Sequence, residues 1–243
     1  MRGIILAGGL GTRLGDLTKI TNKHLLPVFD RPMIYYPIKT LVSSGITEIM
    51  IIVSGPHSGS FIPILKNGEE LGITKLEYAY QSKPDGGIAD ALALAENFAG
   101  NEKIAVILGD NIFDEDFKFY FKLFDSIGAG AEIFLKEVEN LRELGVPRFE
   151  NGVIKEIIEK PSIPPSDYAV LGLYLYDSNV FSYIKECSPS ARKQLEITDV
   201  NNLYLNKGEL RYRLVDGFWK DAGTYDNLLE AGKYMYSKQK GSK

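Results

Sequence analysis

The sequence predicts an α/β protein with a doubly wound, mostly parallel β-sheet. Two observations support this prediction: strand-like and helix-like segments alternate over the first half of the 243-residue chain, and 44% of all residues are hydrophobic. The alternation implies parallel strands joined by helices, and the hydrophobic content is enough to bury the core of a large domain without disulfides. We expect a single domain over residues 1–243, with a first half of about 1–128 and a second half of about 129–243.

Strands and helices of the first half follow one another in order. An apolar strand over Gly3–Ala7 runs directly into a glycine-rich loop. Pro32 suits the first turn of a helix that reaches about Ser44, and Gly45 then ends it. The later segments repeat these patterns, with strands over Ile49–Val53, Leu76–Tyr80 and Ile104–Leu108 and helices over Ile88–Phe98 and Phe117–Ile127.

The second half is richer in strands. After about Ala129, apolar segments alternate with turns that contain glycine, proline and asparagine. The predicted strands cover Glu132–Val138, Val153–Glu159 and Leu171–Tyr176. A helix is expected over Tyr225–Lys238, and residues 238–243 are expected to form a frayed tail. No internal repeat or linker interrupts the chain.

Composition excludes several classes of protein. The single cysteine, Cys187, follows an apolar stretch, so we expect a structural residue and not a nucleophile. Together with the lack of a signal peptide, it favours the cytoplasm. No apolar run approaches the roughly 18 residues that span a bilayer, and the formal charge of −4 argues against nonspecific nucleic-acid or membrane binding. Phosphorylated ligands therefore require a local cluster of cations or backbone amides.

Such a cluster lies near the N-terminus. The loop Gly8–Arg13 follows a strand, and glycines let backbone amides approach phosphate oxygens closely. It has neither the Walker nor the dinucleotide-binding spacing, and by itself it fits equally well with glycines that merely turn the chain. Arg13 and Lys23 favour the phosphate interpretation, because a lysine placed before an apolar run loses hydration unless an anion pairs with it.

Two N-terminal segments resemble the signature of the nucleotidyltransferases that activate sugar 1-phosphates: Leu6–Leu14 (LAGGLGTRL) and Lys23–Val28 (KHLLPV). Further matches follow in the family's order. They are Gln81, Leu108–Asn111 (LGDN), Glu159–Pro161 (EKP), Leu195–Asp199 (LEITD) and Trp219–Thr224 (WKDAGT). Within this family the chain most resembles the short glucose-1-phosphate thymidylyltransferases, which make dTDP-glucose for deoxysugars such as rhamnose.

The resemblance implies a Rossmann-like mixed sheet of the nucleotidyltransferase (GT-A-like) type, with a nucleotide half followed by a sugar-phosphate half. It implies magnesium-dependent transfer from dTTP to α-D-glucose 1-phosphate, by in-line attack on the α-phosphorus with release of pyrophosphate. No protein nucleophile is needed, so positioning and charge neutralisation should supply the catalysis. Family precedent also implies a homo-oligomer.

Site residues carry over at matching positions. Arg13, Lys23 and Lys160 are the implied catalytic residues, and Asp110 and Asp221 are the implied Mg²⁺ ligands. The implied nucleotide-binding residues are Leu6, Gly8, Gly9, Gly11, Thr12, Arg13, Lys23, Gln81, Gly86 and Gly87. Those implied for the sugar phosphate are Asn111, Gly145, Glu159, Lys160, Val170 and Arg192.

Several of these residues have simpler interpretations. Asp110 could cap a helix or turn, Glu159 and Lys160 could form a surface ion pair, and Arg192 could be a solvated loop residue. We expect the Gln81 amide to form hydrogen bonds with both N3–H and O4 of thymine or uracil, and the loop at Gly86 and Gly87 to close over the base.

The match also departs from the family. His24 stands where many longer members have glutamine, and Asp90 replaces another glutamine, so the base contacts are less secure than the phosphate contacts. Longer members carry a C-terminal extension that contributes to an allosteric nucleotide site, and we expect no feedback through that site here. The alternatives are a UTP-using or modified-hexose enzyme and a noncatalytic sugar-nucleotide sensor. A glycosyltransferase is disfavoured because Asp110–Ile112 provides no Asp-x-Asp motif.

Overall fold

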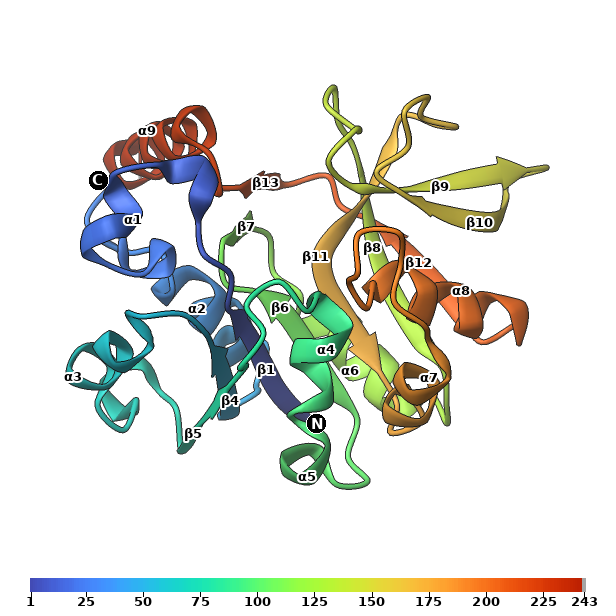
Figure 1. The fold of residues 1–243 in the computed structure, drawn as a ribbon, viewed down its shortest axis with the longest axis horizontal. Helices are drawn as coiled ribbons and strands as arrows, with labels where there is room; N and C mark the ends of the chain where they lie inside the picture. The colour runs from blue at the N-terminus through green and yellow to red at the C-terminus, as the bar shows by residue number, and fades with distance from the viewer. Residues whose placement is uncertain (242–243) are drawn as a thin grey trace.

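A seven-stranded sheet joins the two halves of the chain (Figure 1). The computed structural model describes residues 1–241, and the strand order is β12-β8-β11-β6-β1-β4-β5. All neighbouring strands are parallel except for the two pairs made by β11, so the predicted mixed, mostly parallel α/β sheet is confirmed. The strands are β1 (Arg2–Ala7), β4 (Glu48–Val53), β5 (Lys75–Tyr80), β6 (Ile104–Leu108), β8 (Ala131–Glu137), β11 (Tyr168–Tyr176) and β12 (Leu210–Leu214).

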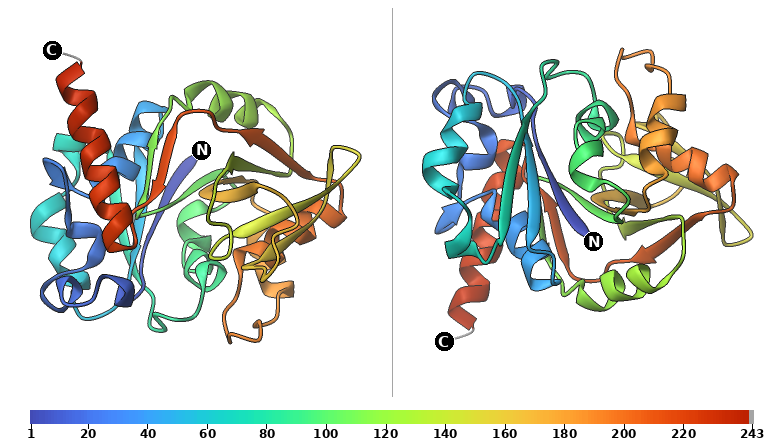
Figure 2. Two further views of the ribbon diagram at one scale, coloured as in Figure 1. Left: turned by 90° about the horizontal axis from the view of Figure 1, so that it is seen from above. Right: turned by 90° about the horizontal axis from the view of Figure 1, so that it is seen from below.

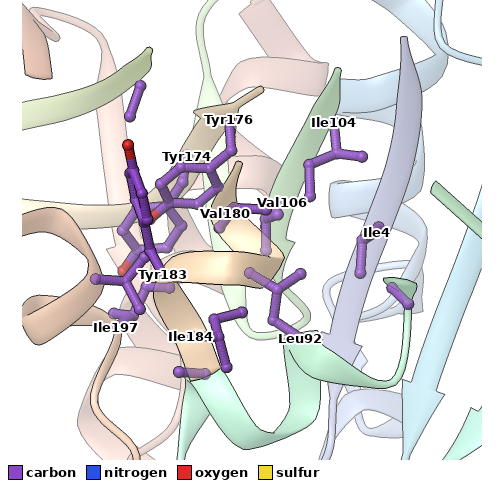
Figure 3. Close-up of a cluster of buried hydrophobic side chains, with 14 of the residues drawn as sticks. Ile4, Leu92, Ile104, Val106, Tyr174, Tyr176, Val180, Tyr183, Ile184 and Ile197 are labelled. Atoms are coloured by element: carbon purple, nitrogen blue, oxygen red, sulfur yellow. The ribbon is translucent and has the colours of Figure 1, made fainter. Parts of the chain in front are cut away.

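Both faces of the sheet are buried, which explains the continuous apolar runs of its strands. Successive side chains point to opposite faces, so Ile4 and Leu6 pack on one side while Ile5 and Ala7 pack on the other. Figure 3 shows the first of these two cores, where side chains such as Val106 of β6 and Tyr176 of β11 meet the covering helices.

Helices cover the two faces in separate groups (Figure 2). The face in Figure 3 is covered by α4 (Ile88–Ala93), α5 (Glu96–Ala99), α7 (Val180–Glu186) and α8 (Ile197–Asn206). The opposite face is covered by α2 (Tyr35–Ser43), α3 (Phe61–Leu65) and α6 (Lys118–Ser126). No helix within residues 1–241 is long and apolar enough to cross a membrane.

Three small strand pairs surround the sheet. A hairpin of β9 (Gly145–Glu150) and β10 (Val153–Glu159) projects from the second half, and β2 (Pro27–Val28) pairs with β3 (Arg31–Pro32) in the first. The third pair joins β7 (Asn111–Asp114) to β13 (Phe218–Asp221). After β13, helix α9 (Tyr225–Gly241) returns to the N-terminal half and contacts β2 (Figure 2).

The structure corrects three expected elements. The helix expected from Pro32 begins at Tyr35, because Arg31–Pro32 pair with Pro27–Val28 instead. The helix expected over Ile88–Phe98 is two short helices, α4 and α5, separated by a turn at Ala95. Residues 238–241 belong to α9 and are not a frayed tail, since Lys238 pairs with Asp114. Residues 242–243 lie outside the described part of the chain.

Cys187 has the structural character expected of it. Burial raises the pKa of its thiol to about 11, with smaller contributions from Asp199 and Glu186. Its Sγ–H donates to the Tyr183 carbonyl at 3.3 Å. The thiol is therefore protonated at neutral pH and a poor nucleophile.

Candidate active site

A cavity of about 350 Å³ opens where β1 and β6 end, at the edge of the sheet where open α/β proteins bind ligands. Both halves of the chain line it. Among the predicted site residues, those that line the cavity are Leu6, Gly8, Gly9, Arg13, Lys23, Gln81, Gly87, Asp110, Asn111, Gly145, Glu159, Lys160, Val170, Arg192 and Asp221. Gly11, Thr12 and Gly86 do not line it, and their contact with nucleotide stays a prediction.

The glycine-rich loop after β1 requires its glycines. Gly9 and Gly11 have φ angles of 88° and 65°, a region that favours glycine. A Cβ on Gly8 would lie 3.0 Å from Ser54 Oγ, and that hydroxyl accepts a hydrogen bond from the Gly9 amide at 2.7 Å. A Cβ on Gly11 would lie 2.7 Å from Thr18, so the close contact between the loop and Thr18 requires glycine here. The loop therefore exposes backbone to the cavity, as a phosphate site needs.

Four charged side chains from distant parts of the chain meet beside this loop. Lys23 Nζ lies 2.5 Å from Asp110 Oδ2, and Arg13 lies 3.9 Å from Asp221. The β7–β13 pair brings the two carboxylates together, since Asp221 lies opposite Asn111 and the Ala222 amide donates to the Asp110 carbonyl. Each carboxylate therefore has one cation within 4 Å.

Because Gly223 lacks a side chain, both aspartates and Arg13 can approach it closely. A Cβ at this position would lie 2.8 Å from Asp221 Oδ1, 3.0 Å from the Arg13 guanidinium and 3.3 Å from Asp110 Oδ2. Two carboxylates around a small space, with a cavity for phosphate oxygens and water, form the donor set that Mg²⁺ prefers. The residues present therefore fit the implied cation.

The titration of the cluster reflects its crowded charges. Burial opposes ionisation of Asp110, but the charge of Lys23 and hydrogen bonds from Lys23 and Asn111 hold its pKa well below its usual range. Burial and then the charge of Asp110 raise the pKa of Asp221 to about 6. One of the two carboxylates thus lacks a full counter-charge, which a bound cation would supply.

His24 is a neutral residue of the cavity wall. Burial, followed by the charge of Lys23, lowers its pKa to about 3. Asn22 Oδ1 accepts the His24 backbone N–H, so the ring Nδ1 at 2.7 Å from the same oxygen carries a proton. Gly109 has space for this ring only because it lacks a side chain, since its Cβ would lie 2.7 Å from His24.

The expected base-binding side of the cavity combines Gln81 with the loop that precedes α4. Gln81 is buried, and its amide donates to the Gly87 carbonyl at 3.2 Å. The loop is fixed to the second half of the chain, because Leu195 N donates to the Gly86 carbonyl and Ala89 N donates to Leu195 O. The loop that is expected to close over the base is thus tied by backbone hydrogen bonds to the segment that precedes α8.

Replacing Gly87 with alanine is expected to destabilise the protein by about 3 kcal/mol and to lower nucleotide affinity. Gly87 has a φ of 99°, and its Cβ would lie 2.4 Å from the Leu195 carbonyl oxygen, a backbone atom that cannot rotate away. Chemical denaturation and nucleotide titration measure the two effects. Gly152→Ala is the matched control, because Gly152 has a φ of 77° with no atom near its Cβ position. Equal stability losses in both variants would contradict the prediction.

The sugar side contains a network centred on Glu159. Its carboxylate accepts hydrogen bonds from Arg192 at 2.9 Å and from the Thr198 hydroxyl at 2.6 Å. Arg192 also pairs with Glu196 at 2.9 Å. Arg192 is thus an exposed turn residue, as in the simpler interpretation, but its charge is shared between two carboxylates.

Lys160 is held in an unusual backbone conformation. Its φ is 47°, although the residue before a proline normally stays extended. Its amide donates to Leu144 O, and its ammonium reaches Glu143 at 3.3 Å with about a third of the side chain exposed. Strained residues of this kind collect at functional sites, and here the strain directs a lysine at the cavity.

Asn111 has more structural contacts than the sequence predicts. Its Oδ1 accepts from the Gly172 amide at 3.0 Å and from the Trp219 indole at 2.7 Å, while its Nδ2 donates to Asp110. Only one N–H of its amide is left for a ligand. Asn111 therefore orients Asp110 as well as lining the cavity.

Comparison with known proteins identifies the family. The profile described as nucleotidyl transferase matches residues 2–238. The chain belongs to this family. It is therefore a nucleotidyltransferase enzyme, as its N-terminal segments indicated.

Relatives of this nucleotidyltransferase carry a narrower name. The glucose-1-phosphate thymidylyltransferase of Neisseria meningitidis is 43% identical, over 98% of this chain and 84% of its own. The Mycobacterium tuberculosis H37Rv protein of that name is also 43% identical, over 97% and 82%. A Bacillus anthracis structure assigned as a glucose-1-phosphate thymidylyltransferase, in complex with sucrose, is 50% identical with a TM-score of 0.91, covering 96% of this chain and 94% of its own. A UDP-glucose pyrophosphorylase complexed with UDP-glucose is 25% identical with a TM-score of 0.81, over 98% of both chains.

Some residues of the nucleotidyltransferase cavity had no role assigned from sequence. Glu143, Glu196, Thr198 and Tyr174 all line it. Glu196 and Thr198 lie in the LEITD segment, which signalled the family without indicating what each side chain contacts. Glu143 and Tyr174 have no sequence signal, because only the position of β9 beside β11 brings them to the cavity.

Proposed function

We propose that this nucleotidyltransferase transfers a thymidylyl group from dTTP to α-D-glucose 1-phosphate, giving dTDP-glucose and pyrophosphate with Mg²⁺ as cofactor. The names of relatives that match almost all of this chain support the choice of these two substrates. The observation that carries the proposal is the meeting of Arg13, Lys23, Asp110 and Asp221 in one cavity, whose lining also includes Glu159 and Lys160. A homo-oligomer in the cytoplasm stays an expectation.

The reaction forms one bond and breaks another at the α-phosphorus of dTTP. A phosphate oxygen of glucose 1-phosphate attacks, and the bond to the β-phosphate breaks with pyrophosphate leaving on the opposite side. The attacking phosphate is already ionised, so no side chain has to remove a proton. The chain needs to align the two substrates and neutralise their charge.

Three cations of the cavity have separate tasks in this proposal. Lys23 exchanges its contact with Asp110 for the α-phosphate, where negative charge redistributes during attack. Arg13, at the end of the glycine-rich loop, stabilises the negative charge of the leaving pyrophosphate. Lys160 holds the attacking sugar phosphate, and Glu159 accepts hydrogen bonds from the sugar hydroxyls.

Asp110 and Asp221 would hold the magnesium ion, which when bound supplies positive charge to the phosphate oxygens of the nucleotide. The carboxylates are preorganised for this role. The Gly223 amide donates to Asp221 Oδ1 at 2.8 Å, and the Asn111 amide donates to Asp110 Oδ1 at 3.1 Å.

The test is a substrate profile of the purified protein. It combines dTTP, UTP and dCTP with glucose 1-phosphate, galactose 1-phosphate and a modified hexose 1-phosphate, and it measures the nucleotide sugar by chromatography and pyrophosphate by a coupled assay. We expect dTDP-glucose as the product with the highest kcat/KM. Faster turnover of UTP would support the UTP-using alternative, in line with the UDP-glucose pyrophosphorylase neighbour. If no combination of substrates gives a product, the result would favour the alternative of a noncatalytic sugar-nucleotide sensor.

Replacing Asp221 with asparagine is expected to raise the Mg²⁺ concentration needed for half-maximal activity by about ten-fold or more, because one anionic ligand is lost. Activity is measured as free Mg²⁺ is varied at a constant concentration of nucleotide. Asp226→Asn is the matched control, since Asp226 is an exposed residue of α9 with the same charge. An unchanged magnesium dependence in Asp221→Asn would remove this residue from the proposed site.

A further inference from the structure

The orientation of the Gln81 amide is set by two neighbours. Its Nε2 donates to the Gly87 carbonyl at 3.2 Å and to Asp90 Oδ2 at 2.7 Å. Both neighbours accept hydrogen bonds only, because one is a backbone carbonyl oxygen and the other is a carboxylate oxygen. The amide nitrogen must therefore face them, and the amide oxygen must face the other way.

The amide oxygen is the group left for a ligand. Within residues 1–241, Oε1 of Gln81 accepts no hydrogen bond. It lies toward the glycine-rich loop, 3.1 Å from the position of a Cβ on Gly8, and both residues line the cavity. This geometry corrects the expectation that the amide meets N3–H and O4 of the base together, because both hydrogens of its NH₂ group are already used.

We propose that Asp90 is a specificity-determining positioning residue, which locks the Gln81 amide with its oxygen toward the nucleobase. The inference rests on the proposed function, in which this side of the cavity holds the base. Thymine and uracil present an N3–H donor, which the locked oxygen accepts. Cytosine presents an acceptor at N3, so it meets an oxygen that cannot be exchanged for a donor.

Without Asp90 the lock would weaken. A flipped Gln81 would direct its oxygen at the Gly87 carbonyl and the Asp90 carboxylate, losing both hydrogen bonds and bringing like charges together. The bond to Asp90 is the stronger of the two, because it is shorter and its acceptor is charged. Asp90 therefore contributes most of the free-energy cost of turning the Gln81 amide into the orientation that would pair with cytosine.

Gly86 allows Asp90 to reach this position. A Cβ on Gly86 would lie 2.3 Å from Asp90 Oδ2, so any other residue there would displace the carboxylate. This explains how Gly86 matters for the base although it does not line the cavity. Its backbone also accepts from the Leu195 amide, which fixes the start of α4 and with it the position of Asp90.

The test replaces Asp90 with asparagine, which keeps the shape but supplies an NH₂ donor that a flipped Gln81 oxygen can accept. We expect the ratio of kcat/KM for dTTP to that for dCTP to fall about ten-fold or more, since a hydrogen bond to a charged group is lost. A purely structural role would lower both constants together and leave their ratio unchanged. Asp85→Asn is the matched control, because this exposed aspartate in the same loop has no hydrogen bond within residues 1–241 and does not line the cavity.

Equilibrium binding separates this inference from the proposed function. Calorimetric titration of dTTP and dCTP, without a sugar phosphate, measures base selection even if no product forms. A loss of selectivity in Asp90→Asn, with the control unchanged, supports the lock whatever the chemical step. An unchanged ratio in folded Asp90→Asn, or a wild type that binds both nucleotides equally or neither, would overturn it. If Asp90→Asn does not fold, Asp90→Ser is measured in the same way.

Discussion

Replacing Lys23 with alanine is expected to lower kcat by about 100-fold or more, the scale of losing one preorganised electrostatic donor. The Lys23 side chain is largely buried, so its charge acts in a medium of lower dielectric than water. Asp110, 2.5 Å away, balances this charge. When the triphosphate enters, the lysine is the cation that can move to the α-phosphate without leaving the cavity wall.

The variant also leaves Asp110 without its cation, so the thermal unfolding temperature is expected to fall. Steady-state kinetics must therefore be measured below the unfolding transition of the variant, as followed by circular dichroism. Lys19→Ala serves as the control, because Lys19 is an exposed lysine of the same N-terminal region that pairs with Asp16 at the surface. A folded Lys23→Ala protein that keeps kcat within a few-fold of wild type would exclude Lys23 from the mechanism.

Replacing Gly223 with alanine is expected to lower kcat/KM by a similar factor of about 100, the scale of displacing reacting groups by an ångström. The added methyl group would occupy the space between Asp110, Asp221 and Arg13, each within 3.3 Å of its position. Gly223 has no positive φ, so alanine is compatible with its backbone. The loss should therefore affect the site and leave the fold intact.

The comparison that isolates this effect is Gly128→Ala, whose Cβ position has no atom within 4 Å and whose φ is not positive. Both variants add one methyl group without backbone strain. Kinetics and unfolding curves of the two proteins are then directly comparable. If Gly223→Ala retains wild-type kcat/KM and magnesium dependence, the space beside Gly223 is not the position of the cation.

Local patterns in the sequence were enough to predict the layers of the fold. The apolar runs of β1, β4 and β6 are buried on both faces, and this double burial makes them recognisable without tertiary information. The glycine-rich loop was equally readable, because positive φ angles and close approach restrict the residue type at each position. The family motifs then indicated which cations and carboxylates to expect in the cavity.

Short and irregular elements were not predictable in this way. Strands β7 and β13 have four residues each, too few for a pattern, and they form only because the chain returns after more than a hundred residues to pair Asp221 with Asn111. Strand β12 and helices α7 and α8 were missed for a related reason, since long-range packing against the sheet stabilises them more than local propensity does.

The sequence by itself determined the class of fold, the glycine-rich loop and the residue types of the cavity, because each of these depends on neighbours along the chain. Tertiary structure alone decided how the charges are shared. It pairs Lys23 with Asp110, divides Arg192 between Glu159 and Glu196, and turns the Gln81 amide with Asp90. Hydrogen bonds and ion pairs depend on distances of a few ångströms between segments far apart in sequence, and only the folded chain sets those distances.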